Sequence, residues 1–281
     1  MNIRVISALV ALPILIFFVL TGGYVFDIGI GIITIIAIYE YTNVYKASSI
    51  NVISPIIVFG FIVTYTLIFF NISKYNMMII YLITLLSMAT PIFKEKYDII
   101  SSAVTVIGYV YIVGFFSLLI PIRSHEYGAS LIWLVLLISF FCDTFAYYIG
   151  KNFGKHKLCP KVSPKKTVEG SLGGIFGSIL GVVLWGFLNP NISFNWTLLI
   201  VMAIIASIIS QIGDLSASLI KRYNGAKDYG KIMPGHGGIL DRFDSILFTA
   251  PVVYCYIIFF IGWFLWLEKT RPYLKLLLLL L

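Results

Sequence analysis

Long apolar runs, separated by short polar loops, constrain this chain more than any other feature of its sequence. A helix that spans a membrane needs about 20 consecutive, mostly apolar residues. Runs close to that length cover residues 5–21, 24–43, 52–71, 77–93, 99–121, 130–149, 171–189, 196–219 and 246–267. Because a helix satisfies its own backbone hydrogen bonds in lipid, the pattern predicts an all-α fold, a polytopic membrane bundle of about nine transmembrane helices.

The composition supports a membrane location and excludes a water-soluble fold. The chain is 60% hydrophobic and 11% charged, whereas a soluble domain is about half apolar and about a quarter charged. Its net charge of +8 would also suit a nucleic-acid binder, but no basic segment outside the runs is large enough to fold as such a module. We therefore expect no nucleic-acid partner.

Two lysine-rich loops determine the predicted orientation. Residues 150–170 contain six lysines and one acid, and residues 220–245 contain five lysines or arginines. Positively charged loops face the cytoplasm, and the two runs between these loops place both of them on that side. The sequence predicts a multi-pass protein of the inner (cytoplasmic) membrane, with an active site that faces the cytoplasm.

The second of these loops contains KDYGKIMPGHGGILDRFDS, residues 227–245, which has the composition of a metal and phosphate site. Its glycines let the backbone approach a phosphate group closely. Asp241 and Asp244 share one face if a helix resumes at Ile239, and with Asp228 they offer the carboxylate oxygens that Mg²⁺ prefers. The alternative is a solvated loop whose charges pair with one another.

Three further residues of the same segment are candidates for contact with a substrate. Lys227 and Arg242 can hold phosphate oxygens, the arginine through its planar fork. His236 lies between glycines, where it is a candidate general base, phosphate donor or loop-fixing residue. These roles of His236 stay open, because phosphoryl-type transfer depends on positioning and charge neutralisation more than on proton abstraction.

Polar residues inside the apolar runs predict a polar cavity at the cytoplasmic face. One set recurs at helical spacing: Ser207, Gln211, Asp214, Ser218 and Lys221. Asp143 and Glu40 lie near the cytoplasmic ends of two other runs. An acid within a span costs about 2.5–3.5 kcal/mol on insertion scales. Each of these acids is therefore either an interhelical hydrogen-bond clamp or part of a functional site.

Residues 161–170, KVSPKKTVEG, form a second polar cluster. Ser163 and Pro164 are expected to begin a turn, and Lys166, Thr167 and Glu169 follow it. Spacing alone supports a functional and a structural role for these three residues equally.

Four segments of the chain resemble one known family, and one of them is the opening R-V-I-S-A-L-V-A-L-P from Arg4. Ser218–Asp244 contains S-x-x-K-R-x4-K-D followed by H-G-G-x-x-D-R-x-D, which resembles the signature of the phosphatidate cytidylyltransferases, also called CDP-diacylglycerol synthases. The segments K-V-S-P-x-K-T-x-E-G from Lys161 and D-T-F-A-Y-x-x-G from Asp143 are similar to the same family. The resemblance extends from the first apolar run to about residue 265.

This resemblance implies a CTP:phosphatidate cytidylyltransferase, an enzyme of phospholipid biosynthesis that makes CDP-diacylglycerol and pyrophosphate from CTP and phosphatidate. It implies Mg²⁺ as the cofactor, with a second cation left open, and a homodimer. We expect residues 1–268 to form a single integral-membrane catalytic domain and residues 269–281 to form a low-complexity tail.

The resemblance also implies roles for individual residues. The metal ligands would be Asp228, Asp241 and Asp244, with Lys227, Arg242 and His236 as further catalytic residues. The substrate-binding set would comprise Ser218, Lys221, Arg222, Ser163, Lys166, Thr167, Glu169, Asp143 and Asp214.

Two other functions fit parts of the sequence. A CTP-dependent lipid kinase would also need a cytoplasmic site for metal and phosphate, but only cytidylyl transfer moves the label of α-labelled CTP into the lipid. A transporter would use the intramembrane acids as ion sites. Against transport, the acids gather toward one membrane face, and no internal repeat pairs the two halves of the chain.

Overall fold

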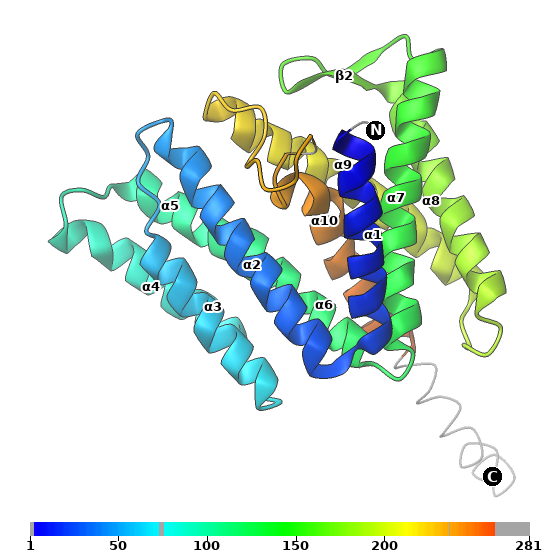
Figure 1. Cartoon of the computed structure of the whole chain (residues 1–281), viewed down its shortest axis with the longest axis horizontal. Helices are drawn as coiled ribbons and strands as arrows, with labels where there is room; N and C mark the ends of the chain where they lie inside the picture. Colours follow the sequence, from blue (N-terminus) through cyan, green and yellow to red (C-terminus); the bar gives the residue numbers. More distant parts are fainter. Residues whose placement is uncertain (1–2, 73–75, 236, 262–281) are drawn as a thin grey trace, which may run out of the picture.

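A computed structural model describes residues 3–72, 76–235 and 237–261, and these residues are mostly helical. The tail at 269–281 lies outside the described residues. Within the described ranges each of the nine expected runs corresponds to a helix or to consecutive helical segments, and residues 262–267 of the last run lie outside the described part of the chain (Figure 1). The segments are α1 (Ile3–Thr21), α2 (Gly23–Lys46), α3 (Ser54–Phe69), α4 (Asn76–Phe93), α5 (Ile99–Gly108), η2 (Tyr109–Gly114), α6 (Phe115–Ser124), α7 (Gly128–Phe153), α8 (Val168–Leu188), α9 (Trp196–Tyr223), α10 (Leu240–Tyr256) and η3 (Ile257–Ile261).

Within the described residues, six helical segments are long and apolar enough to cross a membrane. These are Gly23–Lys46, Ile99–Ser124, Gly128–Phe153, Val168–Leu188, Trp196–Tyr223 and Leu240–Phe259. The apolar parts of α1, α3 and α4 are shorter. Large apolar side chains such as Tyr81, Leu85 and Phe187 are exposed, which lipid accepts and water disfavours. The chain is a multi-pass membrane protein built from helices, and a crossing by all nine segments stays a prediction.

A short hairpin departs from the all-α expectation. Strands β1 (Lys157–Cys159) and β2 (Ser163–Thr167) pair antiparallel, with Cys159 opposite Ser163. The expectation that Ser163 and Pro164 begin a turn is wrong, because the turn lies at 160–162 and Ser163 starts β2. Pro164 is tolerated there because each strand of a two-stranded sheet is an edge strand, where one missing N–H group costs little.

Helices α7 and α8 pack closely because α8 presents glycines to α7. A Cβ atom at Gly177 would lie 2.6 Å from the carbonyl oxygen of Phe141, and one at Gly173 would lie 2.7 Å from the side chain of Ile149. Small residues let helix backbones approach one another in a membrane, where the hydrophobic effect does not drive association. This contact holds α7, which carries Asp143, against the helix that follows the hairpin.

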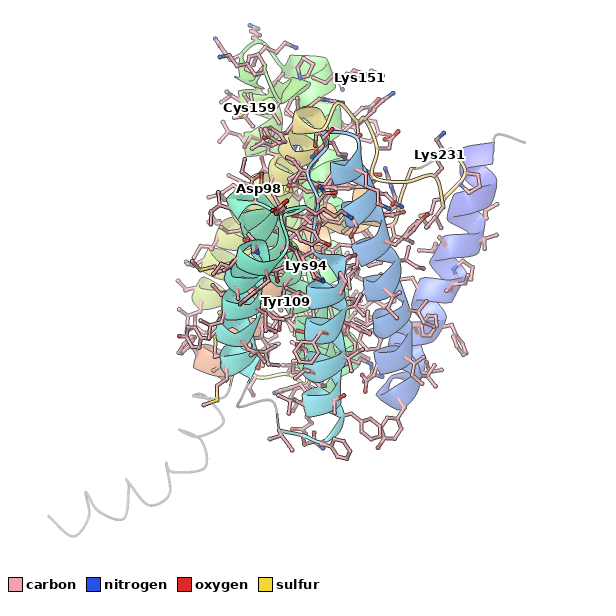
Figure 2. The ribbon with its side chains drawn as sticks, turned by 90° about the vertical axis from the view of Figure 1, so that its left-hand side faces the viewer. Lys94, Asp98, Tyr109, Lys151, Cys159 and Lys231 are labelled. Carbon is pink, nitrogen blue, oxygen red and sulfur yellow. The ribbon has the colours of Figure 1, made fainter. Side chains whose placement is uncertain are left out.

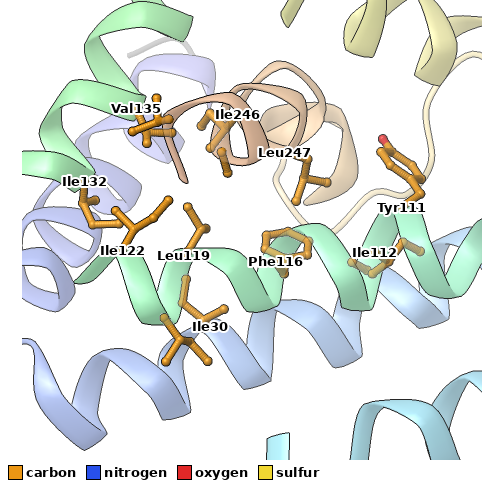
Figure 3. Packing of buried hydrophobic residues seen from close by; sticks show 14 of the residues in the cluster. Ile30, Tyr111, Ile112, Phe116, Leu119, Ile122, Ile132, Val135, Ile246 and Leu247 are labelled. Carbon is orange, nitrogen blue, oxygen red and sulfur yellow. The ribbon is translucent and has the colours of Figure 1, made fainter. Parts of the chain in front are cut away.

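The buried core lies around α6 and joins the two halves of the chain. Figure 3 shows Phe116, Leu119 and Ile122 of α6 among side chains of α2, α7 and α10. Helix α10 also packs along α9. The first turn of α10 is therefore held inside the bundle rather than on its outer surface.

Both lysine-rich loops lie at the same end of the bundle, as the orientation argument requires. Figure 1 shows the hairpin and the segment between α9 and α10 at this end, and in Figure 2 Lys151, Cys159 and Lys231 lie toward it. The link between α2 and α3 joins them there, because the Ser48 hydroxyl donates a hydrogen bond to the side chain of Asn224. We refer to this end below as the hairpin end.

Candidate active site

Helix α10 begins at Leu240, which confirms that a helix resumes after Ile239. Asp241 and Asp244 consequently share one face of its first turn, and both are buried, with 7% and 8% of their surface exposed. Arg242, between them, is exposed. The first turn of α10 thus presents two buried carboxylates, from Asp241 and Asp244, and the accessible guanidinium group of Arg242.

Asp241 accepts three hydrogen bonds that join separate segments. Lys221 Nζ on α9 lies 2.6 Å from Asp241 Oδ1, and this ion pair is buried. The backbone N–H groups of Tyr229 and Gly238 donate to Asp241 Oδ2 at 2.8 Å and 2.9 Å. The approach of the chain depends on Gly237, whose φ of +90° suits glycine and at which a Cβ atom would lie 2.9 Å from Asp241 Oδ2. Asp241 therefore fastens the loop between α9 and α10 to both helices.

Glu40 of α2 holds the same loop from the opposite side. Its carboxylate accepts hydrogen bonds from the backbone N–H groups of Ile239 and Leu240, both at 3.0 Å. These N–H groups belong to the start of α10, where a helix lacks internal acceptors and favours a negative charge. Gly230 and Gly238 lie against the Glu40 carboxylate, where a Cβ atom at either position would overlap it. Glu40 lies beside the α9–α10 loop and caps α10, and its position at the cytoplasmic face stays a prediction.

A second group of acids comes from three helices. Asp143 of α7, Asp214 of α9 and Asp244 of α10 are close enough for their charges to act on one another. Lys166 of β2 forms an ion pair with Asp214, with 2.6 Å between Nζ and Oδ2. The charge of Arg242 also acts on Asp143. Residues from distant parts of the sequence thus form one mixed cluster of acids and bases at the hairpin end.

Thr167 and Glu169, two of the predicted substrate-binding residues, make hydrogen bonds that stabilise the junction between the hairpin and α8. Thr167 is buried and caps α8, because its hydroxyl accepts a hydrogen bond from the N–H of Gly170 at 3.1 Å. Glu169 accepts hydrogen bonds from the N–H of Lys155 at 3.0 Å and from His156 Nδ1 at 2.6 Å. Both residues fix the base of the strand that carries Lys166, and contact with a substrate stays a prediction for them.

The remaining predicted residues lie on or near the surface of α9, the α9–α10 loop and the hairpin. Lys227, Asp228 and Arg222 are exposed, and Arg222 donates a hydrogen bond to the carbonyl oxygen of Ala226 at 3.0 Å. Ser218 and Ser163 are half-buried. His236 lies outside the described residues.

The predicted metal ligands do not form one ligand set in this structure. Among the described residues, no three side chains of His, Cys, Asp or Glu are arranged to hold a metal ion. Asp228 is exposed, whereas Asp241 is directed at Lys221 and the loop N–H groups. The chemistry of the donors nevertheless suits a divalent cation, because carboxylate oxygens are the ligands Mg²⁺ takes.

Tyr111 is a residue of this region that the sequence did not indicate. It lies in η2, its side chain is buried, and the charges of Asp244, Asp241 and Asp214 all act on it. In the sequence, a tyrosine inside an apolar run cannot be distinguished from any other aromatic residue of the core. No sequence pattern predicted the π-helical turn in which Tyr111 lies. Only the folded chain brings it beside the acids.

Two surface pockets formed by the described residues lie away from the predicted site. One of about 400 Å³ is lined by residues between Gly186 and Trp196, and one of about 410 Å³ lies between α2 and α3. Neither is lined by the predicted site residues, so a polar cavity at the hairpin end stays a prediction.

Comparison with known proteins gives a consistent result over most of the chain. A model of the Cytidylyltransferase family matches residues 2–260. A protein of Staphylococcus aureus (strain COL) named phosphatidate cytidylyltransferase is 34% identical over 262 residues, which cover 90% of this chain and 97% of that protein. A protein of Bacillus subtilis (strain 168) with the same name is 31% identical over 261 residues, covering 90% of this chain and 96% of the relative. The matched region includes every predicted site residue discussed above.

Proposed function

This chain belongs to the cytidylyltransferase family, and from that premise we propose how it works as a phosphatidate cytidylyltransferase. It transfers CMP from CTP to phosphatidate, giving CDP-diacylglycerol and pyrophosphate. The observation that carries the proposed site is the cluster of Asp143, Asp214 and Asp244 with Lys166 and Arg242, which four separate segments bring together.

In our proposal the hairpin end faces the cytoplasm and about nine helices cross the inner membrane. The lysine-rich hairpin and the basic loop between α9 and α10 lie together at that end, and such loops stay on the cytoplasmic side. The acids near them would line a polar cavity that opens both to the cytoplasm, from which CTP arrives, and to the bilayer, which holds phosphatidate.

The cluster supports a role for Mg²⁺. Three carboxylates repel one another when all are ionised, and a divalent cation would add to the positive charge of Lys166 and Arg242 in favouring their ionised forms. We propose Asp244 and Asp241 as ligands. Asp214 is better supported than the exposed Asp228 as their partner, because the charge of Asp214 acts on Asp244. When bound, Mg²⁺ would stabilise negative charge on the phosphate oxygens and on the leaving pyrophosphate.

The protein's own residues would overcome the repulsion between two polyanionic substrates. A phosphatidate oxygen forms a new bond to the α-phosphorus of CTP, and the bond from that phosphorus to the bridging oxygen breaks, so pyrophosphate leaves with the electron pair. The attacking phosphate is already an anion, so little deprotonation is required. Arg242 and Lys227, both exposed, can hold phosphate oxygens, and fixed positive charge of this kind lowers the barrier.

Lys221 and Lys166 would act differently from these exposed cations. Lys221 is buried against Asp241 and keeps the loop in place. Lys166 and Asp214 retain 26% and 31% side-chain exposure, so Lys166 can exchange its carboxylate partner for a phosphate group. His236 would contribute a hydrogen bond from the same loop.

We also propose that the enzyme is a homodimer. The family resemblance supports this assembly, and the exposed apolar helix faces leave room for a second copy as well as for lipid. Native mass spectrometry of the detergent-solubilised protein would give the subunit number directly.

The test of the proposed function uses the purified protein with phosphatidate, Mg²⁺ and each of the four nucleoside triphosphates. We expect only CTP to react, with pyrophosphate released and label from α-³²P-CTP recovered in the lipid. Label that enters the lipid only from γ-³²P-CTP would instead identify a lipid kinase. Absence of any nucleotide-dependent lipid product would overturn the proposal.

A further inference from the structure

The hydroxyl group of Tyr111 is buried without a hydrogen-bond partner among the described residues. Only 6% of the residue is exposed. Its ring is well packed, with its centroid 5.8 Å from that of Phe248 and 6.5 Å from that of Phe115. Figure 3 shows the oxygen directed away from the helix that carries Phe116. Buried hydroxyl groups are normally paired, so an exception requires an explanation.

The surroundings of this hydroxyl belong to the polar site. The charges of Asp244, Asp241 and Asp214 act on it. The neighbouring Tyr229 hydroxyl donates a hydrogen bond to the carbonyl oxygen of Ala217 at 3.4 Å, and it lies near enough to interact with the Tyr111 hydroxyl, although outside the geometry of a hydrogen bond. Tyr111 lies in η2, a π-helical turn between α5 and α6, and such turns are often found at functional sites.

Several oxygens of the nearby acids already accept hydrogen bonds from other donors. Asp241 accepts from Lys221 and from two loop N–H groups, and Asp244 Oδ1 accepts from the N–H of Ser245 at 2.8 Å. The Tyr111 hydroxyl thus lies within reach of the charges of these acids but makes no hydrogen bond to any of them. A phosphate group that entered the cluster would supply an acceptor, and a hydrogen bond to a charged acceptor is stronger than one between neutral groups.

We propose that Tyr111 contacts the substrate, and that its neutral hydroxyl donates a hydrogen bond to a phosphate oxygen held beside Asp214, Asp241 and Asp244. This inference rests on the proposed function. The phosphate belongs either to CTP or to phosphatidate, and the kinetics of each substrate distinguish these two sources.

The experiment compares Tyr111→Phe with a matched control, Tyr109→Phe. Tyr109 is also buried in η2, but its hydroxyl is hydrogen-bonded to Thr64 Oγ1 at 2.8 Å. For Tyr111→Phe we expect kcat/KM to fall at least tenfold for the substrate that is contacted, with Tm unchanged or higher because the unpaired hydroxyl is gone. For Tyr109→Phe we expect the reverse, a lower Tm with kcat/KM within twofold of the parent.

The two substrates are titrated separately at saturation of the other. A rise in KM for CTP alone would assign the contact to the nucleotide, and a rise for phosphatidate alone would assign it to the lipid. A kcat/KM within twofold of the parent for both would overturn the proposal. A Tyr111→Phe protein that is less stable or does not fold would overturn it too, because the hydroxyl would then have a structural partner. Activity of the parent, measured in parallel, tests the proposed function independently of Tyr111.

Discussion

Glu40 Oε2 accepts a hydrogen bond from the backbone N–H of Leu240 at 3.0 Å, although the two residues are 200 positions apart in the sequence. This contact joins the C-terminal part of α2 to the first residue of α10. Asp241 holds the same loop through the N–H groups of Tyr229 and Gly238. Two buried carboxylates on different helices thus hold the glycine-rich α9–α10 loop. Substitution of either one should therefore change the stability or the activity of the enzyme.

Glu40→Gln should weaken the start of α10. The amide keeps one acceptor oxygen but turns an N–H donor toward a second backbone N–H, and it removes a negative charge from a helix N-terminus. Loss of such a cap costs about 0.5–2 kcal/mol, so Tm in detergent and kcat should both fall. Glu95→Gln is the matched control, because Glu95 is exposed, and an equal effect of both changes would contradict the capping role.

Gly238→Ala should disrupt the loop by a steric route. A Cβ atom there would overlap the Glu40 carboxylate, so either the carboxylate or the loop must move, and CMP transfer should fall with stability. Gly114→Ala is the comparison, because its Cβ atom would only meet the carbonyl oxygen of Tyr109 at 3.8 Å. Thermal unfolding and initial rates of the two variants distinguish local crowding from a general effect of alanine.

Asp241→Asn and Asp244→Asn should both abolish CMP transfer but differ in stability. Asp241→Asn leaves Lys221 buried without its partner, and removal of one member of a buried pair costs about 3–5 kcal/mol. Asp244 has no comparable ion pair among the described residues, so Asp244→Asn should still fold and insert. Activity within about tenfold of the parent in a CTP-incorporation assay would argue against a metal role for either acid.

Lys166→Ala should impair substrate use with little loss of stability. The ion pair with Asp214 is partly exposed, and such pairs contribute about 0–1 kcal/mol to folding. We expect KM for CTP or phosphatidate to rise several-fold while Tm stays near that of the parent. Lys165→Ala controls for a change of charge in the same strand, because Lys165 is exposed. Unchanged kinetics for both substrates would remove Lys166 from the site.

The helices were predictable because each helix that crosses lipid needs about 20 consecutive apolar residues, a pattern that is visible in the sequence of that helix alone. That Asp241 and Asp244 share one face was predictable for a similar reason, since their spacing of three already implies it once a helix starts, whereas their burial is seen only in the structure. The cap made by Glu40 was not predictable, because its partners are backbone N–H groups, which every residue except proline carries. Tyr111 and the hairpin were missed for related reasons. Short strands leave little periodicity, and a π-helical turn leaves no residue signature.

Glu40 and Asp241 hold the α9–α10 loop through hydrogen bonds to its backbone N–H groups rather than to its side chains. Substitutions at the exposed positions of this loop can therefore change its chemistry without altering its path, provided that the glycines beside Glu40 and Asp241 are retained. For anyone who wishes to redirect the enzyme toward a different nucleotide or lipid headgroup, this loop offers a main chain held at Tyr229, Gly238, Ile239 and Leu240, to which new contacts can be added one residue at a time.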